Sequence, residues 1–293
     1  MASLKALKIR INSVKSTQKI TKAMKMVAAA KLKRAQNNAE ASRPYAQALE
    51  AVVSSIASKV TIGPQSPKLL AGSGKDHIHM LVVCTSDKGL AGAFNTNIVR
   101  LARKQAEALL AAGKTVKFFC IGRKGYDQLA RTYRSDIVAK IEPGDLGKLT
   151  FAGVQGYGED LTARFEAGEF DVAHLLFSKF VSVLTQEPTV IQLMPVAIKT
   201  PESSVPSVGA SVEYEPDEEE ILADLLPRNV SVQLLRANRE NAASEQGSKM
   251  TAMDNATRNA GDMINRLTIQ YNRTRQAAIT TELVEIISGA EAL

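Results

Sequence analysis

The feature that most constrains this chain is its first 39 residues, which carry ten lysines and arginines and no aspartate, glutamate, glycine or proline. Apolar residues recur there at steps of three and four, the spacing of one face of an α-helix, at Leu4, Leu7, Ile11 and Val14. The ten positive charges exceed the formal net charge of +7 of the whole chain. We therefore expect a long basic helix that meets an acidic partner.

This helix is expected to continue to about Val60, because Pro44 is the only residue before that point that breaks helices. Pro44 should kink the helix without ending it, since helix formers resume at once. The same spacing recurs later in the helix, at Tyr45, Leu49, Val52 and Ile56. Between the two stretches, Ile20, Met24, Val27 and the run Ala28–Ala30 are predicted to continue the apolar stripe with a shifted phase. A helix of ~55 residues is ~80 Å long, which is too long for the core of a compact domain.

A segment rich in glycine, proline and serine, residues 61–75, is predicted to be a linker. After it, β-rich runs alternate with helical runs such as residues 95–112, and the β-rich runs are Ile78–Cys84, Thr115–Ile121 and residues 136–141. This order predicts a Rossmann-like α/β domain over residues 76–212, with a largely parallel sheet and right-handed crossovers. Two further strands, 171–184 and 189–198, are joined so closely that they must form an antiparallel hairpin at the sheet edge.

The last part, residues 213–293, is predicted to be a second long helix. It opens on the acidic run YEPDEEE, where the helix dipole favours negative charge, and Pro227 should break or kink it. A 4-3 apolar seam then runs through Met253, Thr257, Ala260, Ile264, Leu267, Tyr271, Thr274, Ala278 and Thr281. Small residues beside it, Gly247, Ala256, Ala260 and Gly261, would allow a partner helix to come close. The simplest partner is the N-terminal helix of residues 1–60, which gives an antiparallel intrachain coiled coil.

Motifs for catalysis or cofactor binding fail on inspection. Gly113-Lys114-Thr115 ends like a phosphate-binding loop, but it runs from helix to strand, and Ala108 replaces the first glycine. Residues 72–75 are followed by Asp76 where such a loop needs a hydroxyl. The loop at residues 86–95 follows the first strand, where open α/β sheets bind ligands. It lacks the glycine fingerprint, so a tight turn with a helix cap is the favoured interpretation.

Metal, redox and membrane-spanning roles are also not indicated. His77 and His79 share one strand, His174 is distant in sequence, and no further ligand stands at metal spacing. Cys84 and Cys120 lie in apolar runs of different strands, which is typical of buried thiols in a reducing compartment. No apolar run is long enough to cross a bilayer. The chain is therefore predicted to be neither an enzyme by itself nor a cofactor-binding protein.

Two long motifs carry a family resemblance. ITKAMKMVAAAKL at residues 20–32 and AMDNATRNAGDMINRLTIQYNRTRQAAITTELVEIISGA at residues 252–290 resemble the two ends of the gamma subunits of F-type ATP synthases. The SDKGLAGAFN loop and the YEPDEEE turn are also similar, so the resemblance covers the whole chain. It implies a rotor shaft inside a ring of three alpha and three beta subunits. It also implies an α/β domain that sits, with epsilon, on the membrane ring of c subunits, so that contact with the membrane is only indirect.

The resemblance further implies roles for particular residues. The shaft would meet the catalytic ring at Lys19, Lys22, Met24, Lys25, Met26, Arg275, Gln276, Thr280 and Glu282. The beta subunits of the family carry an acidic element that would face the lysine stripe. The apolar tip from Leu283, with Ile286 and Ile287, would turn in a bearing. Glu213, Tyr214 and Glu215 match the foot that meets the c-ring.

Chloroplast members carry an inserted pair of regulatory cysteines, and nothing in this chain resembles it. The lysine-rich start favours a bacterial protein, on the cytoplasmic side of the inner membrane, over a mitochondrial one on the matrix side.

One alternative is a basic coiled coil that binds nucleic acid, but the only early aromatic residue is Tyr45. Another is a nucleotide-using α/β enzyme, which needs an intact phosphate loop.

Overall fold

The computed structural model describes residues 3–58, 63, 66–196 and 218–291. The chain divides into two compact units, which are treated separately below. The two-helix unit consists of Met1–Ala29 and Lys249–Leu293, and the α/β unit consists of Ala30–Ser248. Helices α1 (Leu4–Ala57) and α6 (Glu218–Glu291) each contribute to both units.

The two long helices confirm the prediction for the chain ends. α1 has 54 residues and α6 has 74 residues, and both contain a proline, Pro44 in α1 and Pro227 in α6. Neither proline ends its helix, because each lies in a long run of residues that favour helix on both sides. The acidic run contributes Glu218, Glu219 and Glu220 to the first turn of α6.

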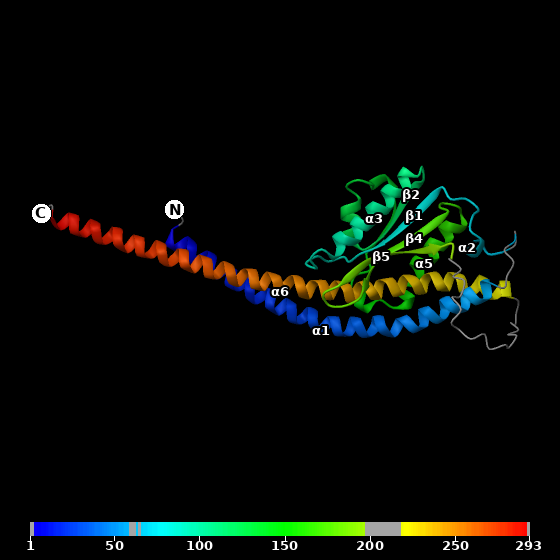
Figure 1. Ribbon diagram of the computed structural model, residues 1–293, viewed down its shortest axis with the longest axis horizontal. Coiled ribbons are helices and arrows are strands. Elements are labelled where there is room, and N and C mark those ends of the chain that lie inside the picture. The colour runs from blue at the N-terminus through cyan, green and yellow to red at the C-terminus, as the bar shows by residue number, and fades with distance from the viewer. Residues whose placement is uncertain (1–2, 59–62, 64–65, 197–217, 292–293) are drawn as a thin grey trace. The chain divides into compact units, whose positions relative to one another are not determined.

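The remaining elements belong to the α/β unit (Figure 1). Its strands are β1 (Ile78–Cys84), β2 (Thr115–Ile121), β3 (Ile137–Ile141), β4 (Val172–Phe180) and β5 (Gln186–Met194). Its shorter helices are α2 (Lys68–Ala71), α3 (Phe94–Ala111), α4 (Arg123–Leu129) and α5 (Phe151–Glu166), with 3-10 turns η1 (Arg134–Asp136) and η2 (Leu146–Lys148).

The five strands form one sheet in the order β3-β2-β1-β4-β5. β1 pairs in parallel with both β2 and β4, β2 pairs in parallel with β3, and β5 is antiparallel to β4. The predicted parallel sheet and edge hairpin are therefore confirmed. β4 is shorter than predicted, since it ends at Phe180, and β5 is shifted, since it begins at Gln186 and ends at Met194. Residues 197 and 198 lie outside the described part of the chain.

Helices cover both faces of this sheet, which is why its central strands are apolar almost throughout. On one face, α3 and α4 pack on Leu81, Val83, Phe118 and Leu176. On the other face, α5 and the parts of α1 and α6 in this unit pack on Met80, Val82, Phe119 and Leu175. Figure 1 shows α3 on one side of the strands, with α5, α1 and α6 on the other.

The buried face of α1 in this unit differs from the predicted one by one position. Ala46 and Val53 are 1% exposed, whereas Tyr45 and Val52, which were expected to face inward, are 51% and 45% exposed. Leu49 and Ile56 are buried as predicted. Neighbouring apolar residues at 45–46 and 52–53 leave two phases open in the sequence. Packing within the α/β unit selects the phase that buries Ala46 rather than the larger Tyr45.

Candidate functional site

The two-helix unit pairs the start of α1 with the end of α6. The hydroxyls of Thr21 and Thr257 lie 2.8 Å apart, and the Gln18 side-chain amide donates to the Thr257 carbonyl oxygen at 3.4 Å. One turn further along, Lys25 Nζ lies 2.6 Å from Asp254 Oδ1. Residue numbers rise along α1 as they fall along α6, so the helices are antiparallel. The predicted coiled coil of the two chain ends is confirmed in this unit.

The seam on α6 follows the predicted 4-3 spacing. Met253, Ala260 and Leu267 are buried. The other predicted seam positions, Thr257, Ile264, Tyr271, Thr274 and Ala278, are half-buried. Thr281, the last predicted seam position, is exposed. Among the small residues, Gly261 lies at the pairing surface, because a Cβ built on it would come within 3.1 Å of Gln18 Nε2.

Two other expectations for the seam were wrong. Ile20 and Val27 are 59% and 58% exposed, so the predicted phase shift in α1 does not occur. Leu7 and Ala28 are buried as predicted, and between them the buried Thr21 and the half-buried Gln18, both polar, occupy the seam positions of α1. Gly247, in the α/β unit, faces the β4–β5 hairpin near Phe180 and Val183 rather than a partner helix.

Charge in the pairing surface centres on Asp254. Its carboxylate binds Lys25 at 2.6 Å and Arg258 Nη2 at 2.7 Å. The hydrogen bond from Lys25 is the largest of the effects that hold the pKa of Asp254 below its usual value, and it outweighs partial desolvation. Lys25 was predicted to face a partner. It is 40% exposed and already shares its charge with α6.

Five of the remaining cations of α1 in this unit form a surface that we call the basic face: Lys5, Lys8, Lys15, Lys19 and Lys22. Arg10 lies on another side of the helix. All are exposed, and none has an ion pair within the described residues. Met26 (61% exposed), Ile20 and Val27 add apolar area beside Lys19 and Lys22. Met24 is half-buried. An uncompensated cationic surface with apolar patches is suited to an acidic, partly apolar partner.

The second predicted contact group, Arg275, Gln276, Thr280 and Glu282, is exposed on α6. The pairing of Lys25 with Asp254 and of Thr21 with Thr257 places the start of α1 near residue 275. Residues 276–291 therefore extend past α1 as an unaccompanied helix. The two predicted groups are not brought together. At 1.5 Å per residue they lie ~20 Å or more apart along the helix axis.

The apolar end of α6 is exposed from Leu283 to Ser288. Leu283, Ile286 and Ile287 are 56%, 69% and 51% exposed, and Val284 is 54% exposed. Such a run of exposed apolar side chains is unusual on a soluble surface and indicates a protein contact. The predicted foot residues Glu213, Tyr214 and Glu215 lie outside the described part of the chain.

The loop at residues 86–95 is occupied by its own side chains. Asn95 Oδ1 accepts a hydrogen bond from the Ser86 backbone N–H at 3.0 Å. The Asp87 carboxylate accepts from the backbone N–H groups of Arg123 at 2.8 Å and Gly144 at 2.6 Å. These contacts support the prediction of a tight turn. The predicted helix cap is not formed by a side chain, because the residue before α3 is Ala93 and no side chain hydrogen-bonds there. Gly113, with φ +74°, lies in the turn that leads from α3 into β2. Its segment therefore runs from helix to strand, as predicted from the sequence.

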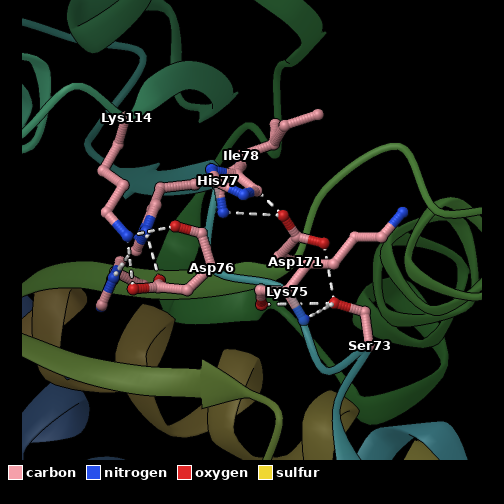
Figure 2. A network of polar contacts seen from close by, with 9 residues as sticks. Ser73, Lys75, Asp76, His77, Ile78, Lys114 and Asp171 are labelled. Carbon is pink, nitrogen blue, oxygen red and sulfur yellow. Dashed lines mark hydrogen bonds and ion pairs between the residues drawn. The ribbon is translucent and has the colours of Figure 1, made fainter.

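A polar network at the amino-terminal edge of the sheet fixes the loop before β1 (Figure 2). Asp171 accepts from the backbone N–H groups of His77 at 2.9 Å and Ile78 at 3.0 Å, and from the Ser73 hydroxyl at 2.7 Å. Burial raises the pKa of Asp171, but these hydrogen bonds outweigh it and hold the pKa below its usual value. The three donors satisfy the Asp171 carboxylate, so we assign this network a structural role.

Three side chains that the sequence did not single out connect the long helices to the sheet. Arg43 of α1 and Glu240 of α6 form a two-point ion pair at 2.7 and 3.0 Å, and Glu240 is 2% exposed. Asn241 is fully buried and bonded to β1 and β4. Their signal in the sequence is weak, because consecutive polar residues in a helix are usually taken as solvent-facing.

The described surfaces define a class of protein that acts by contact. It has a long helix pair with an uncompensated basic face and an α/β unit whose loop after β1 is held by the protein's own side chains. The family model described as ATP synthase matches residues 3–293. The ATP synthase gamma chain of Rhizorhabdus wittichii is 68% identical over 100% of both chains, and that of Methylobacterium nodulans is 59% identical, also over 100% of both. This chain belongs to the ATP synthase gamma chain family.

Solved structures show the same fold. The central stalk and c-ring structure of the Tetrahymena thermophila mitochondrial ATP synthase has a chain with a TM-score of 0.60 and 24% identity, covering 81% of this chain and 99% of that one. A chain of the Euglena gracilis mitochondrial ATP synthase in rotational state 3 has a TM-score of 0.67 and 17% identity, covering 99% and 94%. Within the described residues, no helix is both long and apolar enough to span a membrane.

Proposed function

We propose that this chain is the central-stalk rotor of an F-type ATP synthase, coupling proton flow through the membrane sector to ATP synthesis and hydrolysis. The observation that carries the proposal is the family match over the full chain, together with an antiparallel helix pair that exposes unpaired cations. None of the relatives reported above is a nucleic-acid-binding protein, so the nucleic-acid alternative has no support.

In this proposal the chain itself performs no chemistry. The shaft, residues 1–60 and 213–293, turns inside a ring of three alpha and three beta subunits. The domain of residues 76–212, joined by the linker 61–75, sits with epsilon on the c-ring. An asymmetric shaft makes different contacts with chemically identical catalytic subunits and so favours a different conformation in each.

The contact residues in this proposal rest on the family resemblance, and most of those on the helix pair are also exposed. Lys19, Lys22 and Met26, with Met24 and Lys25 beside them, would meet the acidic element of the beta subunits. Arg275, Gln276, Thr280 and Glu282 would form a second level of contact nearer the tip. Leu283, Ile286 and Ile287 would turn in the bearing, where apolar contact avoids deep electrostatic minima. Glu213, Tyr214 and Glu215 would form the foot on the c-ring, on the cytoplasmic side of a bacterial inner membrane.

The test is purification of the complex after mild detergent extraction, through an affinity tag on this chain. We expect alpha and beta chains at three copies each per copy of this chain, together with epsilon and the c-ring. Replacing Lys19 and Lys22 with glutamate should weaken ATP-driven rotation, while the same change at Lys5 and Lys8, outside the proposed contact, serves as the control. Recovery of this chain without alpha and beta chains would contradict the proposal.

A further inference from the structure

Helix α6 carries a polar stripe where it crosses the sheet of the α/β unit. The stripe consists of Glu240, Asn241, Ser244 and Ser248, of which the first three are at most 2% exposed. The residues of this stripe lie against the carboxyl ends of β1 and β4. These strand ends form the edge at which open α/β sheets usually bind their ligands. Here the edge is occupied by a helix of the same chain.

Asn241 continues the hydrogen-bond ladder between β1 and β4. The pairing of these strands is recorded from His79 with Val172 to Val83 with Leu176. Just beyond it, Asn241 Nδ2 donates to the Cys84 carbonyl oxygen at 2.9 Å, and Asn241 Oδ1 accepts from the Ser178 N–H at 2.8 Å. The side-chain amide therefore takes the place of a peptide group between two strands that diverge.

Ser244 reinforces this contact one helical turn later. Its hydroxyl donates to the carbonyl oxygen of Ser178 at 3.0 Å, so Asn241 and Ser244 together engage both backbone groups of one residue in β4. Ser248 Oγ then donates to the Ala91 carbonyl oxygen at 2.7 Å, in the loop before α3. The stripe thus contacts the sheet and the loop beside it over two turns of α6.

Glu240 and Arg43 hold the end of β4 in the same way. Glu240 Oε2 accepts from the Phe180 N–H at 3.0 Å, and Arg43 Nη2 donates to the Phe180 carbonyl oxygen at 3.1 Å. The two side chains are joined at 2.7 and 3.0 Å. The hydrogen bond that Arg43 donates to Glu240 raises the pKa of Arg43, which keeps its charge at all relevant pH values. One residue of the strand is therefore bound to both long helices at once.

These contacts are of a kind that resists sliding. Apolar side chains pack without strong directional preference, so a helix held by them alone can shift with little loss. A buried hydrogen bond is directional, and breaking it leaves both partners unsatisfied in a low-dielectric interior. We propose that Asn241 and Glu240, with Arg43, form a torque clamp that fixes α6 to the sheet against twisting and sliding. The inference rests on the proposed rotor function.

The clamp residues are positioning residues, because none of them would touch nucleotide or the proton path. Load applied to the α/β unit would pass through the clamp into α6, which continues as one helix to Glu291. Loss of the clamp should therefore soften the rotor elastically while leaving the chemistry of the catalytic ring intact. The variable to measure is the torsional stiffness of the rotor, not only the rate of ATP hydrolysis.

The test compares Asn241→Ala with Asn95→Ala in the complete complex. Asn95 is also buried, but among the described residues its side chain hydrogen-bonds to Ser86 and not to α6, so it matches Asn241 in chemistry without being part of the clamp. With the catalytic ring fixed to a surface, a bead is attached through a cysteine placed at the exposed Glu107 of α3. The angular variance of the bead is recorded during catalytic pauses.

We expect the angular variance to rise about twofold in Asn241→Ala, because a directional buried link is lost, and to stay at the wild-type value in Asn95→Ala. The rate of ATP hydrolysis should be unchanged in both. Glu240→Gln, which keeps the side-chain shape but weakens the link to Arg43, should give an intermediate variance, and it decides the outcome if Asn241→Ala does not assemble.

The clamp would be overturned if every clamp variant that assembles showed the angular variance of the wild type. It would also be overturned if the variance rose as much in Asn95→Ala as in Asn241→Ala. Failure of the wild-type chain to rotate in the complex would instead contradict the proposed function, so the two failures are distinguishable.

Discussion

At the scale of single residues, the most unusual titrating group is His174 in β4. Its Nε2 lies 3.2 Å from Nδ1 of His79, and Nε2 of His79 lies 2.8 Å from Asp76 Oδ1. Burial is the main effect that lowers the pKa of His174 to about 4. The nearby His79 adds to this effect, and Asp76 opposes it. His174 is therefore neutral in the folded protein at pH values where it would be charged in the unfolded chain.

This shift predicts a pH dependence of stability with a definite sign. Between the ordinary histidine pKa of 6.5 and about 4, the unfolded chain binds a proton that the folded chain does not. The contribution of neutral His174 to the free energy of unfolding is fully present above pH 6.5 and is lost as the pH falls toward 4. We expect the wild-type Tm to fall by about 2–4 °C more than that of His174→Gln between pH 7.5 and pH 5.

The control is His77→Gln, a histidine at the start of the same sheet edge with an exposed side chain. Its Tm should follow the wild-type pH dependence, which thermal unfolding of the isolated chain at a series of pH values will measure. If Tm depended on pH identically in the wild type and both variants, His174 would titrate in the folded state as it does in the unfolded state, against the prediction.

At the scale of elements, the seam between α1 and α6 depends on small residues. Gly261 approaches Gln18, and Ala260 is 7% exposed. Leucine at position 261 has to displace the Gln18 amide from Thr257, so Gly261→Leu should cost about 1–3 kcal/mol of stability. Alanine at the same position meets only the end of a flexible side chain and gains helix propensity, so Gly261→Ala should be neutral or slightly stabilising.

The matched surface change is Arg258→Ala, less than one turn away. The Arg258 side chain is 70% exposed, and its one ion pair in the described residues is with Asp254. An exposed pair of this kind contributes little, so the cost should be well under 1 kcal/mol. The measurements are the yield of intact complex and its thermal midpoint. If Gly261→Leu and Arg258→Ala were tolerated equally, the helices would not pack as one shaft in the assembled complex.

At the scale of the whole molecule, the sheet separates two hydrophobic cores, and it also separates the two thiols. Cys84 is buried in the core with α1 and α6, and Cys120 is buried in the core with α3. Although β1 and β2 are neighbours, side chains on opposite faces of a sheet cannot be bridged by a disulfide. Burial raises the pKa of both thiols, that of Cys120 to about 12, so neither forms a thiolate near neutral pH.

The folded chain should therefore not react with a thiol-specific reagent, and both thiols should react once it is unfolded in denaturant. ATP hydrolysis by the complete complex should be the same with and without dithiothreitol. A reducing agent that changed the rate by more than about twofold would point to thiol control through these residues, against their burial. Labelling stoichiometry, measured by absorbance, is the direct readout.

The sequence by itself determined the elements that depend on local pattern. The bounds of β1 and β2 agree with the predicted runs, α1 continues through Pro44 as predicted, and the seam of α6 from Met253 to Ala278 has the predicted spacing. Strand content and helical periodicity are local properties, so they can be read without knowing what a segment packs against. The resemblance that indicated the family also rests on contiguous residues.

Only the tertiary structure decided which of two adjacent phases is buried and which polar residues are internal. Ile20 and Tyr45 are apolar and exposed, whereas Thr21 and Asn241 are polar and buried, because each buried hydroxyl or amide finds its partner on another element. Such partners are far away in sequence: Arg43 and Glu240 are separated by 197 positions. A pattern within one helix carries no information about a hydrogen bond that another helix or strand completes.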